Sequence, residues 1–234
     1  MLAKVHTRIE EILFEDVASE YDARFLAAHL RGLACEFSPE FRSAVADWER
    51  DEELHYRAVL QVYLRDFDPA RAVFERLAGR RPDFAPLGGL FTDEFSIAVL
   101  FAYDELCTVQ AYTKNLPHYD AHDPELGERI RGIISDEGRH YAAFLRVARR
   151  RRRGARELAA VVARIRDTAG TPYAATFVLD HDDRELFDEA VHERAVRVLR
   201  RALRGGADGV ELGPGRRESA RSRVTAPGGA EASA

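Results

Sequence analysis

The chain has 234 residues, a length at which a single globular domain with a substantial apolar core is the usual outcome. Its net charge of −5, with acidic and basic residues interspersed, argues against nucleic-acid binding, and no apolar run approaches the roughly 20 residues that span a bilayer. Cys35 and Cys107 form no Cys-x-x-Cys motif, which excludes a zinc ribbon or a rubredoxin-like iron centre and favours a reduced, cytoplasmic protein.

Helical patterns dominate the beginning of the chain. Apolar residues at helical spacing predict a first helix from about Val5 to Arg31, which Gly32 would end. A second helix is expected to begin at Ser38-Pro39, because serine caps a helix N-terminus and proline fits the first turn. We expect this helix to continue to about Arg65.

The middle of the chain is less regular. Residues 66–89 contain several prolines and a Gly-Gly pair, so only a short helix, Pro69–Leu77, is expected inside this stretch. Thr92 is expected to cap a third helix that runs to about Asn115. Residues 117–123 begin with proline and are expected to form a turn.

A fourth helix is expected to begin at Asp123-Pro124, which is the same kind of start signal as Ser38-Pro39. It should end within the basic run Arg149–Arg153. We interpret this run as a solvated helix C-terminus, where the helix dipole favours basic side chains. The alternative is a docking site for an acidic carrier protein.

Two further helices are predicted at Leu158–Thr168 and Asp183–Leu203, joined across a Thr-Pro pair. Residues 1–204 are therefore expected to form one all-α bundle, with four core helices and additional C-terminal helices. Residues 205–234 consist mostly of Gly, Ala, Pro, Ser and Arg without apolar periodicity, which predicts a disordered tail.

The second and fourth predicted helices carry the same Glu-x-x-His motif, 85 residues apart, and a glutamate in the first helix has its counterpart in the third at the same offset. Residues i and i+3 of an α-helix share a face, so each motif points one carboxylate and one imidazole the same way. The chain thus reads as two helix pairs with matched residues. They are Glu20, Glu52 and His55 in the first pair, and Glu105, Glu137 and His140 in the second.

This residue set is the one that di-iron and di-manganese carboxylate bundles use. The predicted assignment is Glu20 and Glu105 as terminal ligands, Glu52 and Glu137 as bridges, and His55 and His140 as one imidazole for each metal. We expect two iron ions, with manganese as the alternative in one or both positions. The other interpretation, exposed helix charges, is disfavoured by the matched spacing of the two copies.

Four residues near the motifs are candidates for supporting roles. Asp51 and Asp136 precede the motif glutamates, and each is expected to orient the histidine of the other repeat; a solvent-facing position is the alternative. Trp48 either carries electrons to the site or packs in the core. Thr108, one turn after Glu105, either relays a proton during oxygen chemistry or bonds back to a backbone carbonyl.

The remaining histidines are expected outside this site. No partner pattern accompanies four of them, which are His6, His29, His181 and His192. The two beside the predicted turn, His118 and His122, are expected at the surface. The chain contains no phosphate-binding loop and no nucleophile motif.

With these motifs the sequence resembles the ferritin-like di-iron carboxylate superfamily, and within it most closely the soluble acyl-carrier-protein desaturases. The resemblance covers about Ile12 to Leu145. It is carried by Asp16-x-x-x-Glu20, by Trp48 four residues before Glu52, by Glu105-x-x-Thr108, and by Ile130-x-x-Ile133-x-x-Asp136-Glu137-x-Arg139-His140. The chain is shorter than plant-type desaturases, and the link between its first two helices is shortened, so substrate and partner stay open.

The resemblance implies a ferritin-like fold and an oxygen-dependent non-haem di-iron oxidoreductase, with dioxygen as co-substrate. Desaturation, hydroxylation or N-oxygenation of an acyl chain or another small molecule, free or bound to a carrier protein, is the expected reaction. A separate reductase or ferredoxin would supply electrons, and the protein would be a monomer or a homodimer. The alternative is a bacterioferritin-like ferroxidase that stores iron. Helical patterning over roughly sixty residues after the fourth helix favours the oxidoreductase.

Overall fold

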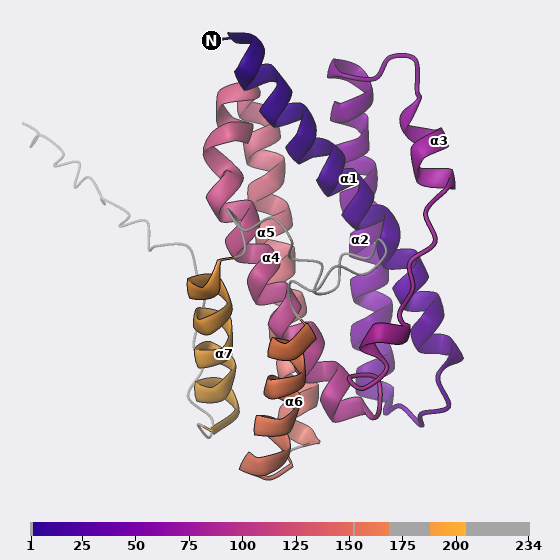
Figure 1. Cartoon of the computed structure of the whole chain (residues 1–234), viewed down its shortest axis with the longest axis vertical. Coiled ribbons are helices and arrows are strands. Elements are labelled where there is room, and N and C mark those ends of the chain that lie inside the picture. Colours follow the sequence, from indigo (N-terminus) through magenta and orange to yellow (C-terminus); the bar gives the residue numbers. More distant parts are fainter. Residues whose placement is uncertain (1, 152, 169–187, 205–234) are drawn as a thin grey trace, which may run out of the picture.

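The computed structural model describes residues 2–151, 153–168 and 188–204. These residues contain helices and no strand, which confirms the predicted all-α bundle (Figure 1). The elements are α1 (Leu2–Gly32), α2 (Pro39–Asp66), α3 (Val73–Ala78), the 3-10 turn η1 (Ala85–Leu87), α4 (Glu94–His122), α5 (Pro124–Arg150), α6 (Ala155–Thr168) and α7 (Glu189–Arg204). None of the described helices is both long and apolar enough to cross a membrane.

The two predicted start signals both form helix caps. The Ser38 hydroxyl accepts a hydrogen bond from the backbone N–H of Phe41, and the Asp123 carboxylate accepts one from the N–H of Glu125. Asp123 is also the residue at which α4 ends, so α4 and α5 are joined by this residue alone. The second helix pair is therefore a tight hairpin.

Gly127 allows close packing at this hairpin. A Cβ at this position would lie 1.8 Å from the Asp120 carboxylate of α4, which is too close for non-bonded atoms, so a larger residue would displace the Asp120 side chain. Asp120 in turn accepts hydrogen bonds of 2.7 and 2.9 Å from Arg131 of α5. The first turns of α5 are thus fixed to the end of α4.

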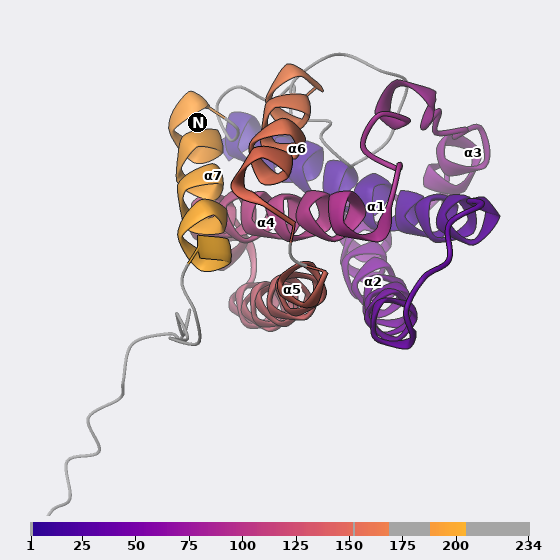
Figure 2. The same ribbon diagram turned by 90° about the horizontal axis from the view of Figure 1, so that it is seen from below.

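Helix α4 lies in the middle of the bundle, as Figure 2 shows, with α1, α5, α6 and α7 in contact with it. Every residue of its first half, from Glu94 to Cys107, is buried. A helix that is apolar around most of its circumference needs such surroundings. Glu105 is located in this buried half, which sets the environment of the predicted ligand.

The core has two apolar clusters; along α1, α2 and α5 the predicted ligands lie between them, and in α4 Glu105 lies near the end of the cluster in its first half. In α1, residues 9–18 belong to one cluster and residues 23–30 to the other, with Glu20 between. In α5, residues 126–133 belong to the first cluster and 141–148 to the second, with the Glu-x-x-His motif between. The fold therefore places a polar layer across an apolar bundle.

Two C-terminal helices cover the first half of α4 (Figure 1). The Arg149 guanidinium donates hydrogen bonds of 2.9 and 3.0 Å to the Ala202 carbonyl, and so fixes α5 to α7. The Tyr103 hydroxyl of α4 lies 2.6 Å from His192 Nδ1 of α7. The sequence shows no pattern for this contact of His192, because it joins residues 89 positions apart.

Three predicted boundaries also need correction. Helix α4 does not end at Asn115 but continues through Pro117 to His122. Proline removes one backbone hydrogen bond, but the buried Tyr119 donates a hydrogen bond of 2.8 Å to Asp16, and this contact offsets the loss. At the start of α4, Asp93 rather than Thr92 is the cap.

The remaining correction concerns the short helix, which begins at Val73 instead of Pro69. The Asp68 carboxylate accepts hydrogen bonds from the backbone N–H groups of Ala72 and Val73 and holds the preceding residues in a turn. The predicted tail 205–234 lies outside the described residues, as does the beginning of the last predicted helix.

Candidate metal centre

Four helices contribute the six predicted ligands to the polar layer. All six are buried, with exposed fractions between 1 % and 6 %. They are Glu20 of α1 (5 %), Glu52 (6 %) and His55 (4 %) of α2, Glu105 of α4 (5 %), and Glu137 (1 %) and His140 (4 %) of α5. The interpretation of these residues as exposed helix charges is therefore wrong. Burying carboxylates away from water carries a large free-energy cost unless cations or hydrogen bonds compensate for it.

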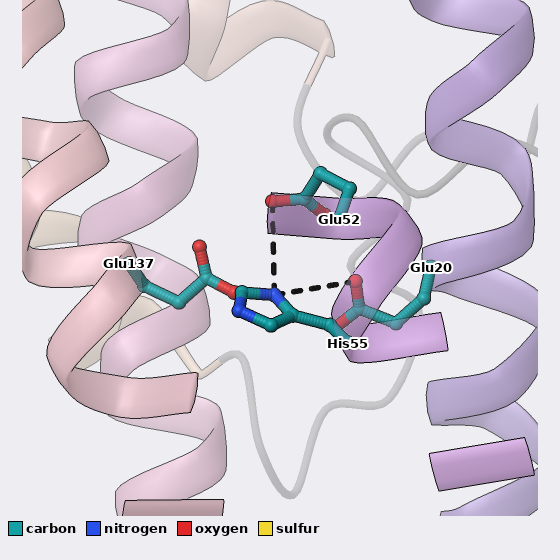
Figure 3. A group of neighbouring side chains, drawn as sticks. All are labelled: Glu20, Glu52, His55 and Glu137. Carbon is teal, nitrogen blue, oxygen red and sulfur yellow. Dashed lines mark ion pairs between the residues drawn. The ribbon is translucent and has the colours of Figure 1, made fainter. Parts of the chain in front are cut away.

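One group of four residues surrounds the His55 imidazole, as Figure 3 shows. His55 Nδ1 lies 3.3 Å from Glu137 Oε1, 3.7 Å from Glu20 Oε2 and 4.0 Å from Glu52 Oε1. One ligand atom from each of the four residues lies within 4.8 Å of all the others, which is a spacing that a single metal ion can bridge.

A second group surrounds the His140 imidazole in the same way. His140 Nδ1 lies 2.9 Å from Glu137 Oε2, 3.5 Å from Glu52 Oε1 and 3.7 Å from Glu105 Oε2. Glu52 and Glu137 belong to both groups, whereas Glu20 and Glu105 belong to one group each. This division is the one expected for two bridging and two terminal carboxylates.

The hydrogen bonding of the layer is incomplete. Glu20 Oε2, Glu52 Oε1 and His55 Nδ1 are buried and form no hydrogen bond. Buried polar atoms in native proteins are almost always bonded, and an exception requires an explanation. All three atoms belong to the first group, and all three are of the type that binds iron or manganese. The residues present therefore fit a bound metal.

The charges of the layer are strongly coupled. Burial and the neighbouring charge of Glu137 raise the pKa of Glu52 and of Glu105 well above the usual range. Burial also raises the pKa of Glu137, but the hydrogen bond with His140 and the nearby His55 imidazole outweigh it and lower that pKa. Burial lowers the pKa of His55, but the neighbouring carboxylates of Glu137 and Glu20 outweigh it and raise that pKa. Crowded carboxylates of this kind are stabilised by divalent cations.

Each imidazole also contacts the aspartate of the other helix pair. His55 Nε2 lies 3.2 Å from Asp136 Oδ2, and His140 Nε2 lies 3.3 Å from Asp51 Oδ2. When Nε2 carries the proton, it donates to the carboxylate and Nδ1 is left to bind a metal. The crossed Asp–His contacts predicted from the sequence are therefore present.

Arginines in turn bind these aspartates. Arg50 lies 3.2 Å from Asp51 Oδ1, and Arg139 forms an ion pair with Asp136 and a longer one of 3.5 Å with Asp51. Burial raises the pKa of Asp51, but the contacts with His140 and Arg50 outweigh it and lower that pKa. A charged aspartate in turn holds the proton on the Nε2 side of its histidine.

A further residue of the site was not predicted. The buried Tyr112 hydroxyl donates a hydrogen bond of 2.7 Å to Glu20 Oε1. Oε2 of the same carboxylate is thereby left facing His55. Tyr112 follows Glu105 by seven residues, or two helical turns on the same face, and this spacing is the sequence signal that would have identified it.

The other candidates have mostly structural contacts. The half-buried Thr108 hydroxyl donates a hydrogen bond of 3.1 Å to the Asp104 carbonyl, which is the back-bonding alternative, so its role as a proton relay stays a prediction. Trp48 is 1 % exposed and packs edge-on against Phe101 at 5.1 Å. An electron-transfer role for Trp48 likewise stays a prediction.

The basic run after α5 is not simply solvated. Arg149 bonds to α7, as described above, while Arg150 pairs with Glu40 and Arg151 lies 2.8 Å from Glu94. Arg153 lies 3.5 Å from Asp93. These described arginines thus connect α5 and its end to other helices, and docking of a carrier protein there stays a prediction.

No family model, no curated protein and no solved structure matches the chain. The resemblance to the ferritin-like superfamily accordingly stays a prediction from the motifs.

Proposed function

We propose that the protein is a non-haem di-iron oxidoreductase of the ferritin-like type, which uses dioxygen as co-substrate. The observation that carries this proposal is the sharing of Glu52 and Glu137 by two groups of buried potential ligands, each with its own histidine. Carboxylate oxygens and imidazole nitrogens suit iron and manganese. Iron held by this donor set supplies the redox chemistry.

The residues around the ligands have distinct tasks in this proposal. Asp51 and Asp136 hold the proton on Nε2 of the histidines and so direct Nδ1 inward. Tyr112 fixes the rotamer of Glu20. The two apolar clusters on either side shield the layer from water except at one pocket, and this strengthens the electrostatic interactions inside the layer.

For the substrate we propose an acyl chain or another small apolar or amine-bearing molecule, either free or attached to a carrier protein. The reaction would be desaturation, hydroxylation or N-oxygenation, with electrons from a separate reductase or ferredoxin. The alternative is a ferroxidase that stores iron and uses the same six ligands. Support for the oxidoreductase comes from α6 and α7, which extend the bundle beyond four helices.

The test begins with anaerobic loading of the purified protein with Fe²⁺. We expect two ions per chain, an optical change when dioxygen is added, and a product when candidate substrates are screened by mass spectrometry. A Glu52→Ala/Glu137→Ala double variant serves as the control and should give neither metal nor optical change.

Three results would contradict the proposal in different ways. Fewer than two ions per chain in the folded protein would show that the di-metal assignment is wrong. A large hollow assembly with many ions per chain, seen by light scattering and metal analysis, would identify a storage protein. Two bound ions with no response to dioxygen would identify a bundle that holds metal without catalysis.

A further inference from the structure

A pocket of about 330 Å³ lies between α1 and α2 and reaches the candidate metal centre. Its lining includes the exposed residues Ala46 and Arg50 as well as the buried Glu20 and Glu52. The pocket thus connects the protein surface with two of the predicted ligands.

The floor of this pocket has unsatisfied ligand atoms. Glu20 Oε2 and Glu52 Oε1 form no hydrogen bond, and both side chains are more than nine-tenths buried. A cation at the inner end of the pocket would therefore lie beside two residues of the first ligand group whose carboxylates have a free oxygen atom. Apolar molecules would find no matching surface at these carboxylates.

The mouth of the pocket carries charges of both signs. Glu49 and Glu53 are two further carboxylates in its lining, and Arg24 lies 3.2 Å from Glu53. The Arg24 guanidinium also lies over the rings of Tyr21 and Tyr56, at 4.1 and 4.9 Å. Its Nε is buried and forms no hydrogen bond. Arg24 is thus a positive charge held at the point where a cation would have to pass.

The second helix pair has no such charged lining. At the offset of 85 residues, Arg24, Glu49 and Glu53 correspond to Val109, Ile134 and Gly138. The ligands are duplicated, but the carboxylates that would attract a cation occur only in the first pair.

We propose that this pocket is the route by which divalent cations reach the di-metal site, and that Arg24 gates it; the inference rests on the proposed function. Glu49 and Glu53 concentrate cations at the mouth, and Glu20 and Glu52 receive them. The gate opens when the Arg24 side chain swings away from Glu53. Because an ion pair near the surface contributes little to stability, breaking the contact with Glu53 adds little to the cost of this movement.

The test measures how fast Co²⁺ binds, by stopped-flow absorbance, in the full chain. Ala46→Trp places a bulky side chain at the exposed edge of the pocket, and we expect it to slow binding about tenfold without a change in final stoichiometry. Ala142→Trp is the matched control, because Ala142 is also an exposed helix residue but belongs to α5. Its binding rate should equal that of the parent protein.

A second pair of variants examines the gate. Arg24→Leu removes the positive charge, and we expect Co²⁺ to bind about tenfold faster at low ionic strength, with a smaller effect in high salt. Arg57→Leu is its control, because Arg57 also binds Glu53, at 2.8 Å, but does not line the pocket. The control should change the rate much less.

The outcomes separate the route from the function on which it depends. Two bound Co²⁺ ions per chain with equal rates in all four variants would overturn the route and leave the di-metal site intact. Failure of the parent protein to bind two ions would overturn both. If Ala46→Trp does not fold, Arg24→Leu and its control decide, and an unchanged Arg24→Leu rate at low salt rejects the gate and the route together.

Discussion

The two helix pairs of this bundle differ in almost everything except their ligands. Both pairs place Glu and Glu-x-x-His at the same height of the polar layer, and both cross an aspartate to the histidine of the other pair. Around these residues, α1 and α2 leave a charged pocket, whereas α4 and α5 form a tight hairpin joined by Asp123 alone. Under the proposed function, two bound metals would require the ligands at these positions and would leave their surroundings free to differ.

The divergence extends to the hydrogen bonds of the ligands themselves. Glu20 accepts a hydrogen bond from Tyr112, but the position that corresponds to Tyr112 in the first pair is Ala27. No tyrosine is therefore available from that position to fix Glu105. The two half-sites are equal in donor set and unequal in how firmly their terminal carboxylates are held.

The largest expected effect is on the number of metals bound, which should differ between variants of the bridging carboxylates and variants of the terminal ones. Glu52→Ala and Glu137→Ala should each abolish binding of both metals, because each side chain belongs to both ligand groups. Glu20→Ala and Glu105→Ala should each abolish one. Metal analysis after anaerobic loading measures the stoichiometry, with Glu128→Ala as the control, because Glu128 is an exposed glutamate of α5 outside both ligand groups. A loss of only one metal in Glu52→Ala or in Glu137→Ala would refute its assignment as a bridge.

The next effect tests whether the helix pairs depend on each other. Asp51→Ala and Asp136→Ala should each weaken one metal position about 10- to 100-fold, as is typical when the carboxylate partner of a histidine ligand is removed. Asp51→Ala should act at His140, and Asp136→Ala at His55. Chelator competition measures the affinities.

The crossing itself is tested in a Glu105→Ala background, which retains only the His55 position. Asp136→Ala should weaken the remaining metal there, and Asp51→Ala should leave it almost unchanged. Asp47→Ala is the control, because Asp47 contacts Arg50 on the exposed surface. If Asp51→Ala is the more damaging variant in this background, each aspartate serves its own pair and the crossed interpretation is wrong.

A smaller effect is expected from Tyr112→Phe. Loss of the hydrogen bond to Glu20 should lower the affinity of one metal position about three- to tenfold, since a hydrogen bond to a charged group contributes about 1.5–3 kcal/mol and part of this is recovered when the carboxylate reorients. In a Co²⁺ titration, the two binding steps should therefore be further apart in affinity or should occur in the opposite order. Tyr119→Phe removes an equally buried hydroxyl that contacts Asp16, and should leave the titration unchanged.

The smallest effect on metal binding is expected from Thr108→Val. Thr108 is half-buried and bonds to the Asp104 carbonyl, so the variant should keep two metals and lose about 1 kcal/mol of unfolding free energy or less. Product formation per dioxygen consumed is the informative measurement. A fall in turnover of about 10²–10⁴ would identify a proton donor, and unchanged coupling would identify a core threonine.

The sequence predicted those features that depend on residues close together in the chain. The spacing of Glu52 and His55 within one helix fixes their common face, so the ligand set follows from the letters alone. Ser38 and Asp123 cap their helices through their own neighbours, and these starts were also predictable. Such features depend on a few consecutive residues.

The features that the sequence could not indicate are contacts between distant helices. Pro117 reads as a turn because the proline rule is local, whereas Tyr119 is held in the helix by Asp16 from the first helix. The contact between Tyr103 and His192 likewise has no spacing that would indicate it. The pocket beside Glu20 is also a tertiary feature, because its walls come from two helices whose relative position the sequence does not state.

The crossed contacts between aspartates and histidines have a consequence for the history of the chain. Asp51 of the first pair contacts His140 of the second, and Asp136 of the second contacts His55 of the first. Reciprocal contacts of this kind are what two identical subunits form across a two-fold axis. One helix pair alone would hold half of a metal centre and would need a second copy of itself to complete it. The present chain has the arrangement that duplication and fusion of such a dimer would give, with a charged pocket in one half alone of the described bundle.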